Sequence, residues 1–260
     1  MTTLKIYDGN AHARRQLEAD PSGLAIRNLV TDVASDPCAS VFVWDGPGGN
    51  EKRRKLYPEY KAGRKPAGED IWAGINLCRE LLGHTKAIQI TVPGYEGDDV
   101  VATLCRMYAP KVDTIRVIST DRDLCALCVL PGVVHSEGSL KNIPPEQVRL
   151  YKATKGDPSD SIPGIKGFGD VAWQNCNKDA LQAWYRSDES LANLGVEEVS
   201  ETFDIPKGCA SWLIDHEPQA RVYYTIVGFI DVPEDELHRG TTVGRPDPAA
   251  VAAALKQWML

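Results

Sequence analysis

Short apolar runs rich in β-branched residues alternate with stretches of helical spacing along the first half of the chain. Helical spacing is found at Leu24–Val33, Ile71–Leu82 and Val100–Tyr108. The apolar runs that alternate with these stretches are Leu4–Tyr7, Ser40–Trp44, Ala87–Ile90 and Thr114–Ile118. Because strands that alternate with helices form a mostly parallel sheet with helices on its faces, the pattern predicts an α/β fold.

The pattern changes at about Pro144. From there, helical pieces are joined by Gly and Pro turns, and Pro144–Gln147 suits the first turn of a helix. We therefore predict an α/β domain at residues 1–143 and an integrated helical subdomain at residues 144–260. No internal repeat and no long polar linker separates them, so we expect the two parts to share a surface.

Composition places the chain among globular proteins, since hydrophobic residues make up 43% and charged residues 25% of its 260 positions. No basic start leads into an apolar run, and no run is long enough to cross a bilayer. We expect a cytoplasmic monomer, bacterial or in an infected host cell, that meets no membrane. The seven cysteines are scattered as reduced thiols would be, and Cys125 and Cys128 lack the second ligand pair of a zinc site.

A net charge of −7 argues against a nucleic-acid partner until the distribution of charge is considered. Between Asn50 and Lys65 only Glu51 and Glu59 are acidic. The basic residues of that segment are Lys52, Arg53, Arg54, Lys55, Lys61, Arg64 and Lys65. A run of charged residues is usually a solvated face of a helix. This run directly follows the strand-end acid Asp45, so it could also guide a polyanion such as a nucleic acid towards the acids.

Acidic residues follow each of the four predicted strands. They are Asp8, Asp45, the group Glu96, Asp98 and Asp99, and the pair Asp121 and Asp123. Each alone would be read as a helix N-cap or first-turn acid. Together they would lie at one edge of a parallel sheet, where their mutual repulsion favours bound cations. Oxygen ligands without histidine indicate Mg²⁺ or Mn²⁺ and not zinc.

Other common chemistries lack their motifs. No glycine-rich phosphate loop follows any strand, so a dinucleotide or ATP is a poor candidate ligand. The five histidines are isolated, and no Ser/His/Asp or Cys/His set is present.

A glycine-rich stretch at Gly156–Ala172 is the most specific segment of the chain. Gly164, Gly167 and Gly169 predict a turn between two short helices that needs positive φ and close backbone approach. Such a turn offers N–H groups to a phosphate and carbonyls to a monovalent cation. An ordinary helical hairpin turn is the alternative.

Taken in order, these motifs resemble those of the flap endonuclease and 5′→3′ exonuclease family, which includes bacteriophage 5′ nucleases and the 5′ nuclease domain of bacterial DNA polymerase I. The segments that carry the resemblance are Tyr7–Asn10, Phe42–Gly46, Tyr57–Arg64, Gly94–Thr103, Ile118–Leu124 and Gly156–Gly164. The resemblance extends from the N-terminus to about Ala172 and is weak beyond it.

The resemblance implies a PIN-like α/β domain with a helix-3-turn-helix DNA-binding module. It implies a first metal held by Asp8, Asp45, Glu96, Asp98 and Asp121, and a second completed by Asp123, Asp157 and Asp160, with Asp99 in support. Tyr60, Lys61 and Arg64 match a clamp or arch over the site, at about residues 46–69. Duplex backbone and K⁺ would bind the hairpin formed by Gly164, Ile165, Lys166, Gly167, Phe168 and Gly169.

The implied activity is structure-specific hydrolysis of DNA by two metal ions, as a 5′→3′ exonuclease, a flap endonuclease or both. Lys61 and Arg64 would add positive charge at the phosphoryl group, and Lys52–Lys55 with Lys65 would guide the strand. Tyr60 would stack on a base, or pack beneath the clamp. Expected partners are DNA with a 5′ end, flap or single-strand/duplex junction, an RNA–DNA hybrid, and replication proteins, in replication, primer removal or repair.

Two alternatives remain open at this point. A PIN-type ribonuclease shares the strand-end acids but has no use for Asp157, Asp160 or the glycine hairpin. A noncatalytic DNA-structure-binding protein would be expected to have lost several acids. Two positions depart from the family pattern: Gly97 stands where alanine is usual, and Asp170 stands where lysine or a neutral residue is common.

Overall fold

The structure is a computed structural model that describes residues 2–20 and 22–258. Contacts divide the chain into two compact units. The first unit comprises Met1–Asn50, Pro66–Leu140 and Ile230–Leu260, and the second comprises Glu51–Lys65 and Lys141–Phe229. This division differs from the predicted domains, because the basic segment belongs with the helical unit and the C-terminal residues return to the α/β unit.

A single mostly parallel sheet is the centre of the first unit. Within the described residues its order is β5-β4-β1-β2-β3-β6, and only β6 is antiparallel to its neighbour. The strands are β1 Thr3–Asp8, β2 Ala39–Trp44, β3 Ile88–Thr91, β4 Thr114–Ile118, β5 Val133–His135 and β6 Thr241–Val243. The α/β prediction is confirmed. The two short edge strands β5 and β6 were not predicted from the sequence.

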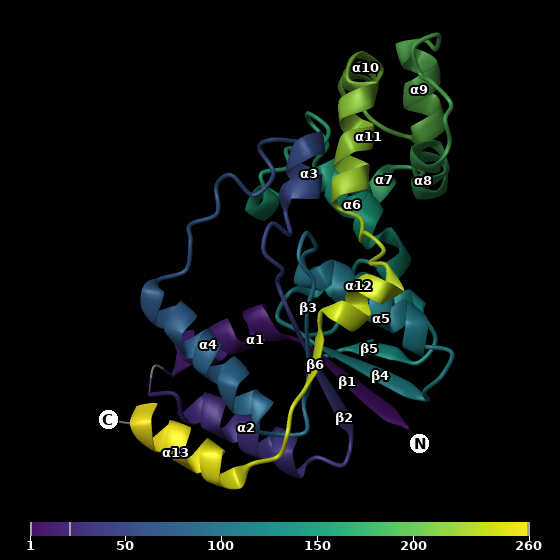
Figure 1. The fold of residues 1–260 in the computed structure, drawn as a ribbon. Helices are drawn as coiled ribbons and strands as arrows, with labels where there is room; N and C mark the ends of the chain where they lie inside the picture. The colour runs from purple at the N-terminus through teal and green to yellow at the C-terminus, as the bar shows by residue number, and fades with distance from the viewer. Residues whose placement is uncertain (1, 21, 259–260) are drawn as a thin grey trace. The chain divides into compact units, whose positions relative to one another are not determined.

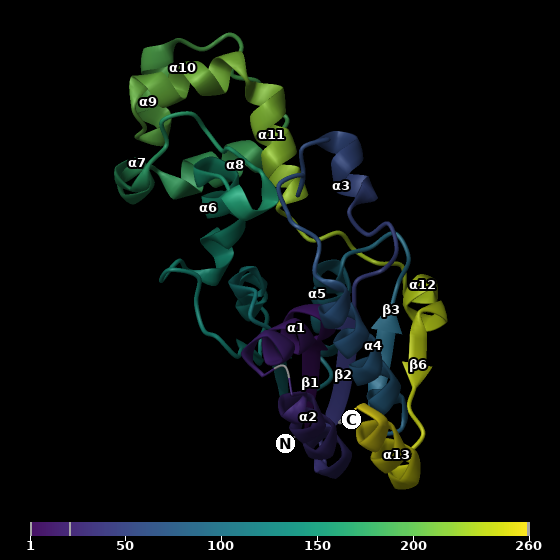
Figure 2. The same ribbon diagram turned by 90° about the vertical axis from the view of Figure 1, so that its left-hand side faces the viewer.

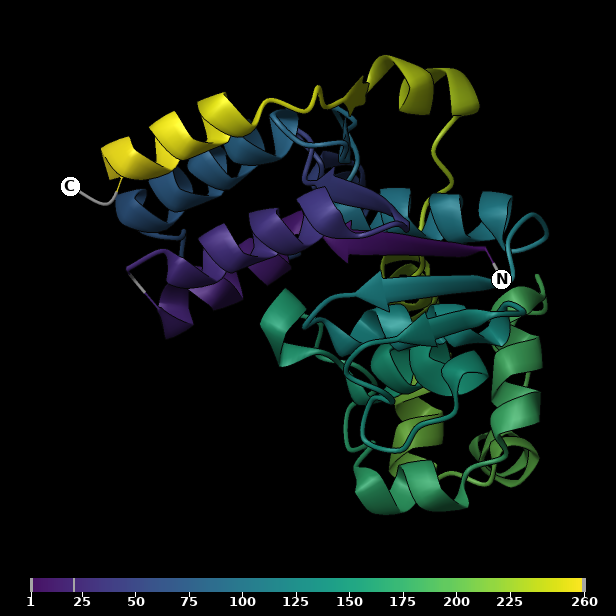
Figure 3. The same cartoon turned by 90° about the horizontal axis from the view of Figure 1, so that it is seen from below.

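Helices cover both faces of this sheet. They are α1 Gly9–Ala19, α2 Leu24–Ser35, α4 Glu69–Gly83, α5 Gly97–Tyr108, α12 Glu234–Arg239 and α13 Pro248–Trp258, with the 3₁₀ helix η1 Arg122–Val129. Phe42 and Trp44 pack in one core with residues of α1, α2 and α4, which lie together with α13 in Figure 3. Val43 points to the other face, which α5 covers. Because both faces are buried, β2 reads as a continuous apolar run.

The second unit is helical (Figure 1). Its elements are α3 Glu51–Leu56, η2 Pro145–Gln147, α6 Val148–Lys155, η3 Pro158–Asp160, α7 Asp170–Asn175, α8 Lys178–Arg186, α9 Val196–Phe203, α10 Lys207–Asp215 and α11 Glu217–Ile226. One core of this unit joins Tyr60, Ile162, Tyr223 and Ile226. The segment that precedes α4 is thus packed among residues more than a hundred positions away.

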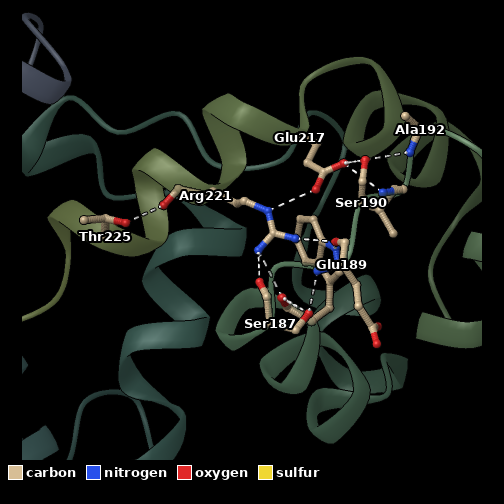
Figure 4. Close-up of polar contacts among 9 residues, drawn as sticks. Ser187, Glu189, Ser190, Ala192, Glu217, Arg221 and Thr225 are labelled. Atoms are coloured by element: carbon tan, nitrogen blue, oxygen red, sulfur yellow. Dashed lines mark hydrogen bonds and ion pairs between the residues drawn. The ribbon is translucent and has the colours of Figure 1, made fainter.

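Arg221 of α11 fixes the loop between α8 and α9 (Figure 4). Its guanidinium donates to the carbonyls of Ser187 at 2.6 Å and Glu189 at 2.5 Å, and lies 4.5 Å from the ring centroid of Trp184. Glu217 accepts from Arg221 Nε at 3.0 Å and from the Leu191 N–H at 2.8 Å. A loop without regular structure is therefore held to a helix by charge-assisted bonds.

No helix in the part of the chain that the structure describes has the length and apolar character required to span a bilayer.

Candidate active site

Asp8 lies at the carboxyl end of β1 and is only 8% exposed. One carboxylate oxygen accepts from the Ala11 N–H at 3.1 Å and so caps α1, and the other accepts from the Ser119 hydroxyl at 2.7 Å. Burial, and to a smaller extent the charges of Asp45 and Asp121, raise the pKa of Asp8, while the two hydrogen bonds lower it, and the net result is a pKa of about 6. The fold therefore holds a carboxylate where its negative charge is poorly compensated by the protein.

Ser119 links two strand ends. Its hydroxyl donates to Asp8 and accepts from the Asp121 N–H at 2.9 Å, across the carboxyl ends of β1 and β4. Asp121 in turn caps η1 by accepting from the Asp123 N–H at 2.9 Å. Sequence reasoning assigned no role to Ser119. The one feature of the sequence that could have indicated a role for Ser119 is its position between an apolar strand and Asp121.

Asp45 follows β2 and is held by residues in the first turns of two helices, α1 and α5. Its Oδ1 accepts from the Gly97 N–H at 2.8 Å, and its own N–H donates to Asn10 Oδ1 at 3.0 Å. Gly46 donates to the carbonyl of Tyr95 at 3.1 Å, and a Cβ at Gly46 would lie 1.8 Å from a backbone oxygen. The loops after β2 and β3 therefore touch, which needs glycine at position 46.

Gly97 belongs to this contact as well, because a Cβ there would lie 3.2 Å from Asp45 Oδ1. Glycine at the usual alanine position therefore leaves room for the Asp45 carboxylate. Asn10, like Ser119, was missed by the sequence reasoning. It lies two residues after Asp8, in a segment that was noted only for its aspartate.

Glu96, Asp98 and Asp99 begin α5, and their roles differ. Glu96 is the N-cap and is 8% exposed, whereas Asp98 is half-buried. Glu96 and Asp99 form a capping box, in which each side chain accepts from the backbone N–H of the other. Asp99 is fully buried, and its second oxygen accepts from the Ile230 N–H at 2.8 Å. The proposal of Asp99 as a metal ligand is therefore corrected, because backbone amides occupy both of its oxygens.

The remaining strand-end acids lie at one edge of the sheet, since Asp8, Asp45, Glu96 and Asp121 each end or follow a parallel strand. Among the described residues, no three carboxylate, His or Cys side chains converge closely enough to hold one ion as they stand. The donor set nonetheless fits a hard divalent cation, because it offers only oxygen and includes the buried Asp8, whose ionisation a cation would favour.

Asp157 and Asp160 belong to the second unit and are paired within it. Asp157 lies 2.5 Å from Lys152 Nζ, and the Asp160 carboxylate accepts from Arg64 Nη2 at 2.5 Å. The Lys61 N–H also donates to the Asp160 carbonyl at 2.9 Å. Lys61 and Arg64, both assigned to the clamp, are therefore bonded to the turn that contains Asp157 and Asp160.

Two residues of the predicted clamp are internal. Arg53 is 3% exposed and donates to the carbonyls of Ile226 and Gly228, each at 2.9 Å. Tyr60 is also 3% exposed, in the core with Ile162 and Tyr223. A side chain this deeply buried cannot contact DNA. The predicted contact of Arg53 with DNA and the predicted stacking of Tyr60 on a base are therefore both wrong. The side chains exposed here are Arg54, Lys55, Arg64 and Lys65, with Lys52 and Lys61 half-buried.

The glycine hairpin lies between α6 and α7. Gly164 and Gly167 have φ of +73° and +83°, as predicted, whereas Gly169 has an ordinary φ of −89°, which corrects the prediction there. Ile165 and Phe168 are buried, so their side chains pack the hairpin and do not face a ligand. Lys166, Gly167 and Gly169 are exposed. Asp170, next to the hairpin, pairs with Lys155.

The family "5′-3′ exonuclease, N-terminal resolvase-like domain" matches residues 24–150. A 5′-3′ exonuclease of Aquifex aeolicus is 29% identical over 237 residues, which cover 80% of this chain and 82% of that protein. This chain is therefore similar in sequence to 5′-3′ exonucleases over most of its length.

Part of a larger polymerase is also similar to this chain. The thermostable DNA polymerase I of Thermus thermophilus is 35% identical over 178 residues, which cover 65% of this chain and 21% of the polymerase. The chain thus spans about a fifth of the length of that relative.

Solved structures of similar fold span nearly the whole chain. A T5 5′-exonuclease described with bound divalent metal ions (zinc) has a TM-score of 0.64 at 20% identity, covering 99% of this chain and 98% of that one. The catalytic core of Rad2 in complex with a DNA substrate has a TM-score of 0.57 at 17% identity, covering 99% and 86%. At these identities the likeness shows the fold.

Proposed function

We propose that the protein is a divalent-metal-dependent 5′ nuclease that hydrolyses phosphodiesters in DNA, as a 5′→3′ exonuclease, a flap endonuclease or both. The observation that carries the proposal is the buried Asp8 carboxylate, with a pKa raised to about 6, at a sheet edge that it shares with the other strand-end acids. In a chain similar to 5′-3′ exonucleases, such an edge is explained by a need for cations.

The metal would be Mg²⁺ or Mn²⁺. Its ligands would come from Asp8, Asp45, Glu96, Asp98 and Asp121, and those of a second ion from Asp123, Asp157 and Asp160. Bound metal would lower the pKa of an attacking water and stabilise charge on the leaving oxygen. The chain's own task is to keep these carboxylates oriented, which Ser119, Asn10 and the Gly97 N–H do through the bonds described above.

Exposed basic residues would attract and position the DNA. Lys61 and Arg64 would add positive charge near the scissile phosphate, and Arg54, Lys55 and Lys65 would contact the backbone of a 5′ single strand. The backbone N–H groups of the hairpin, with Lys166, would hold the duplex, and its carbonyls would hold K⁺. Such contacts recognise the structure of the DNA and carry no sequence information.

We propose as substrates DNA with a 5′ end, a flap or a single-strand/duplex junction, and the RNA–DNA hybrid left by primers. The activity would serve replication, primer removal or repair in the cytoplasm of a bacterium or of an infected cell, beside replication proteins.

The test compares the protein with an Asp121→Asn variant on 5′-labelled flap, blunt duplex, single-stranded DNA, RNA–DNA hybrid and single-stranded RNA. Reactions contain Mg²⁺, Mn²⁺ or EDTA. Asparagine keeps the size of the side chain that caps η1 but removes the charge, so we expect cleavage to fall at least about 100-fold, since a bound metal contributes several kcal/mol to transition-state stabilisation.

Asp188→Asn is the matched control, because Asp188 is an exposed aspartate outside the sheet edge. It should cleave as the unmodified protein does. Cleavage that persists in EDTA, or in the Asp121→Asn variant, would refute the metal mechanism. Cleavage of RNA in preference to every DNA substrate would instead favour a ribonuclease. The length of the products tells the two activities apart, because a flap endonuclease releases intact flaps and an exonuclease releases short nucleotides.

A further inference from the structure

The acidic turn, residues 92–99, joins β3 to α5 and contains Glu96 and Asp98. The C-terminal return, residues 230–243, contacts the elements on both sides of this turn, and both segments belong to the first unit. The sequence assigned no role to the C-terminal return. Its contacts bear directly on where the acidic turn is held.

The C-terminal return first contacts β3. β6 pairs with it in antiparallel register, with Ile88 opposite Val243 and Ile90 opposite Thr241, and the two strands lie side by side in Figure 2. The Thr91 N–H then donates to the Gly240 carbonyl at 3.0 Å. The backbone that leads into the acidic turn is thus bonded up to its last strand residue.

The C-terminal return also runs along α5. Asp99 Oδ1 accepts from the Ile230 N–H at 2.8 Å, and one helical turn later Thr103 Oγ1 accepts from the Val232 N–H at 3.1 Å. Asp99 and Thr103 lie four residues apart, on one face of the helix. Both are buried, with exposures of 0% and 7%, so their hydrogen bonds do not compete with water.

Asp99 joins these contacts to the acidic turn. While Oδ1 binds the C-terminal return, Oδ2 accepts from the Glu96 N–H at 3.3 Å, and the Glu96 carboxylate accepts from the Asp99 N–H. A capping box alone would use only one of the two oxygens. The second oxygen ties the N-cap residue to a segment 131 positions further along the chain.

We infer that Asp99 is a positioning residue, which sets the direction of the Glu96 carboxylate by bonding the Glu96 backbone and the C-terminal return at once. The inference rests on the proposed function, since it concerns a metal ligand of that site. Groups that orient ligands without touching the metal typically change metal affinity about 10–100-fold.

The experiment measures Mn²⁺ binding by titration calorimetry in Asp99→Asn, Glu96→Gln and Thr103→Val variants, with thermal denaturation and cleavage kinetics on a flap substrate. Thr103→Val is the matched control, because it removes a buried bond to the C-terminal return one turn beyond Asp99 and about two turns from Glu96. We expect Asp99→Asn to weaken Mn²⁺ binding about 10–100-fold. At subsaturating Mn²⁺ the variant should have a lower kcat but an unchanged KM for DNA. Excess Mn²⁺ should restore part of the cleavage rate. Thr103→Val should change Mn²⁺ affinity less than about threefold.

Three results would overturn the inference. Equal losses of affinity in Asp99→Asn and Thr103→Val would indicate general loosening of α5. Unchanged Mn²⁺ affinity in Asp99→Asn would show that Asp99 is only a structural cap. A loss of Mn²⁺ affinity as large as that of Glu96→Gln, without rescue by excess Mn²⁺, would show that Asp99 is itself a metal ligand. Failure of the unmodified protein to bind Mn²⁺ or to cleave DNA would instead refute the proposed function.

If Asp99→Asn does not fold, Asp99→Glu provides the same test. It keeps the charge and moves the oxygens by one methylene group, so we expect a loss of Mn²⁺ affinity in the same range. Wild-type affinity in Asp99→Glu would contradict the role of geometry, because negative charge alone would then suffice.

Discussion

At the scale of single residues, the burial of Asp8 has the largest consequence. A carboxylate removed from water loses hydration of its charged form, and two hydrogen bonds compensate for only part of that loss. Neighbouring negative charges from Asp45 and Asp121 add to the effect. The result is a group that takes up a proton more readily than an ordinary aspartate unless a cation is near.

This burial predicts a pH dependence of the metal-free protein. Because the folded-state pKa of Asp8, about 6, lies above its ordinary value of 3.8, the folded state binds more protons between these two values. The free energy of unfolding should therefore fall as pH rises from 4 to 7, by about 2 kcal/mol from this group. Urea denaturation in EDTA at each pH measures it.

Asp8→Asn cannot ionise, so its stability relative to the unmodified protein should increase between pH 4 and pH 7. Saturating Mn²⁺ should remove most of the pH dependence in the unmodified protein and none in the variant. A constant stability difference between the two proteins across this pH range would show that Asp8 titrates normally.

At the scale of elements, α3 combines opposite roles in adjacent residues. Arg53 points inward and satisfies two carbonyls at and beyond the C-terminal end of α11, where a helix leaves acceptors unpaired. Lys55, two positions later, is exposed. A basic run that looks uniform in sequence is therefore divided between stability and charge.

We expect Arg53→Met to lower the free energy of unfolding by about 2–4 kcal/mol, because two buried carbonyls lose their donors. Lys55→Ala should change the free energy of unfolding by less than about 0.5 kcal/mol. It should instead reduce the steepness of the salt dependence of DNA binding, with the magnitude of the slope of log K against log salt smaller by about one. Chemical denaturation and salt-dependent fluorescence anisotropy measure these effects. The assignment of roles fails if Arg53→Met is stable and Lys55→Ala binds DNA with the original salt dependence.

The glycine hairpin allows a matched comparison of two glycines. A Cβ at Gly164 would lie 2.4 Å from the Gly156 backbone nitrogen, at a φ of +73°, whereas a Cβ at Gly169 would meet nothing within 4 Å. Gly164→Ala should therefore cost about 2–4 kcal/mol of stability and weaken duplex binding, whereas Gly169→Ala should cost less than about 1 kcal/mol. Thermal denaturation of the two variants compares them, and equal stabilities would contradict the hairpin geometry.

At the scale of the whole molecule, the chain leaves the first unit twice and returns to it twice. The second return, after Phe229, supplies an edge strand, the bonds to α5 and the helix α13, which packs against α4. These contacts predict that residues 230–243 unfold together with the sheet.

Native-state hydrogen exchange in increasing denaturant tests this prediction. The amides of Val232 and Gly244, bonded to Thr103 and to the Ala87 carbonyl, should exchange with the same free energy as amides of β3. Amides of Val199 and Leu213, in α9 and α10, should form a separate group. Exchange of Val232 and Gly244 with that second group would place the C-terminal return in the helical unit.

Much of the candidate site could be predicted from the sequence, because its signals are local. An apolar run followed by an acid marks a strand end, and parallel strands bring their ends to one edge, so Asp8, Asp45, Glu96 and Asp121 could be assigned without coordinates. The order of the motifs likewise indicated the family. Each of these patterns spans about ten residues and is present before any tertiary contact forms.

Only the tertiary structure decided which of these side chains meet solvent and which meet the backbone. Asp8 is bonded to Ser119 over 111 positions, Asp99 to Ile230 over 131, and Arg53 to Ile226 over 173. Burial and hydrogen bonding depend on such distant pairs, and residue type and local spacing are nearly the same for a ligand and for a cap. For this reason Asp99, Arg53 and Tyr60 could not be told from the functional residues beside them until the chain was folded.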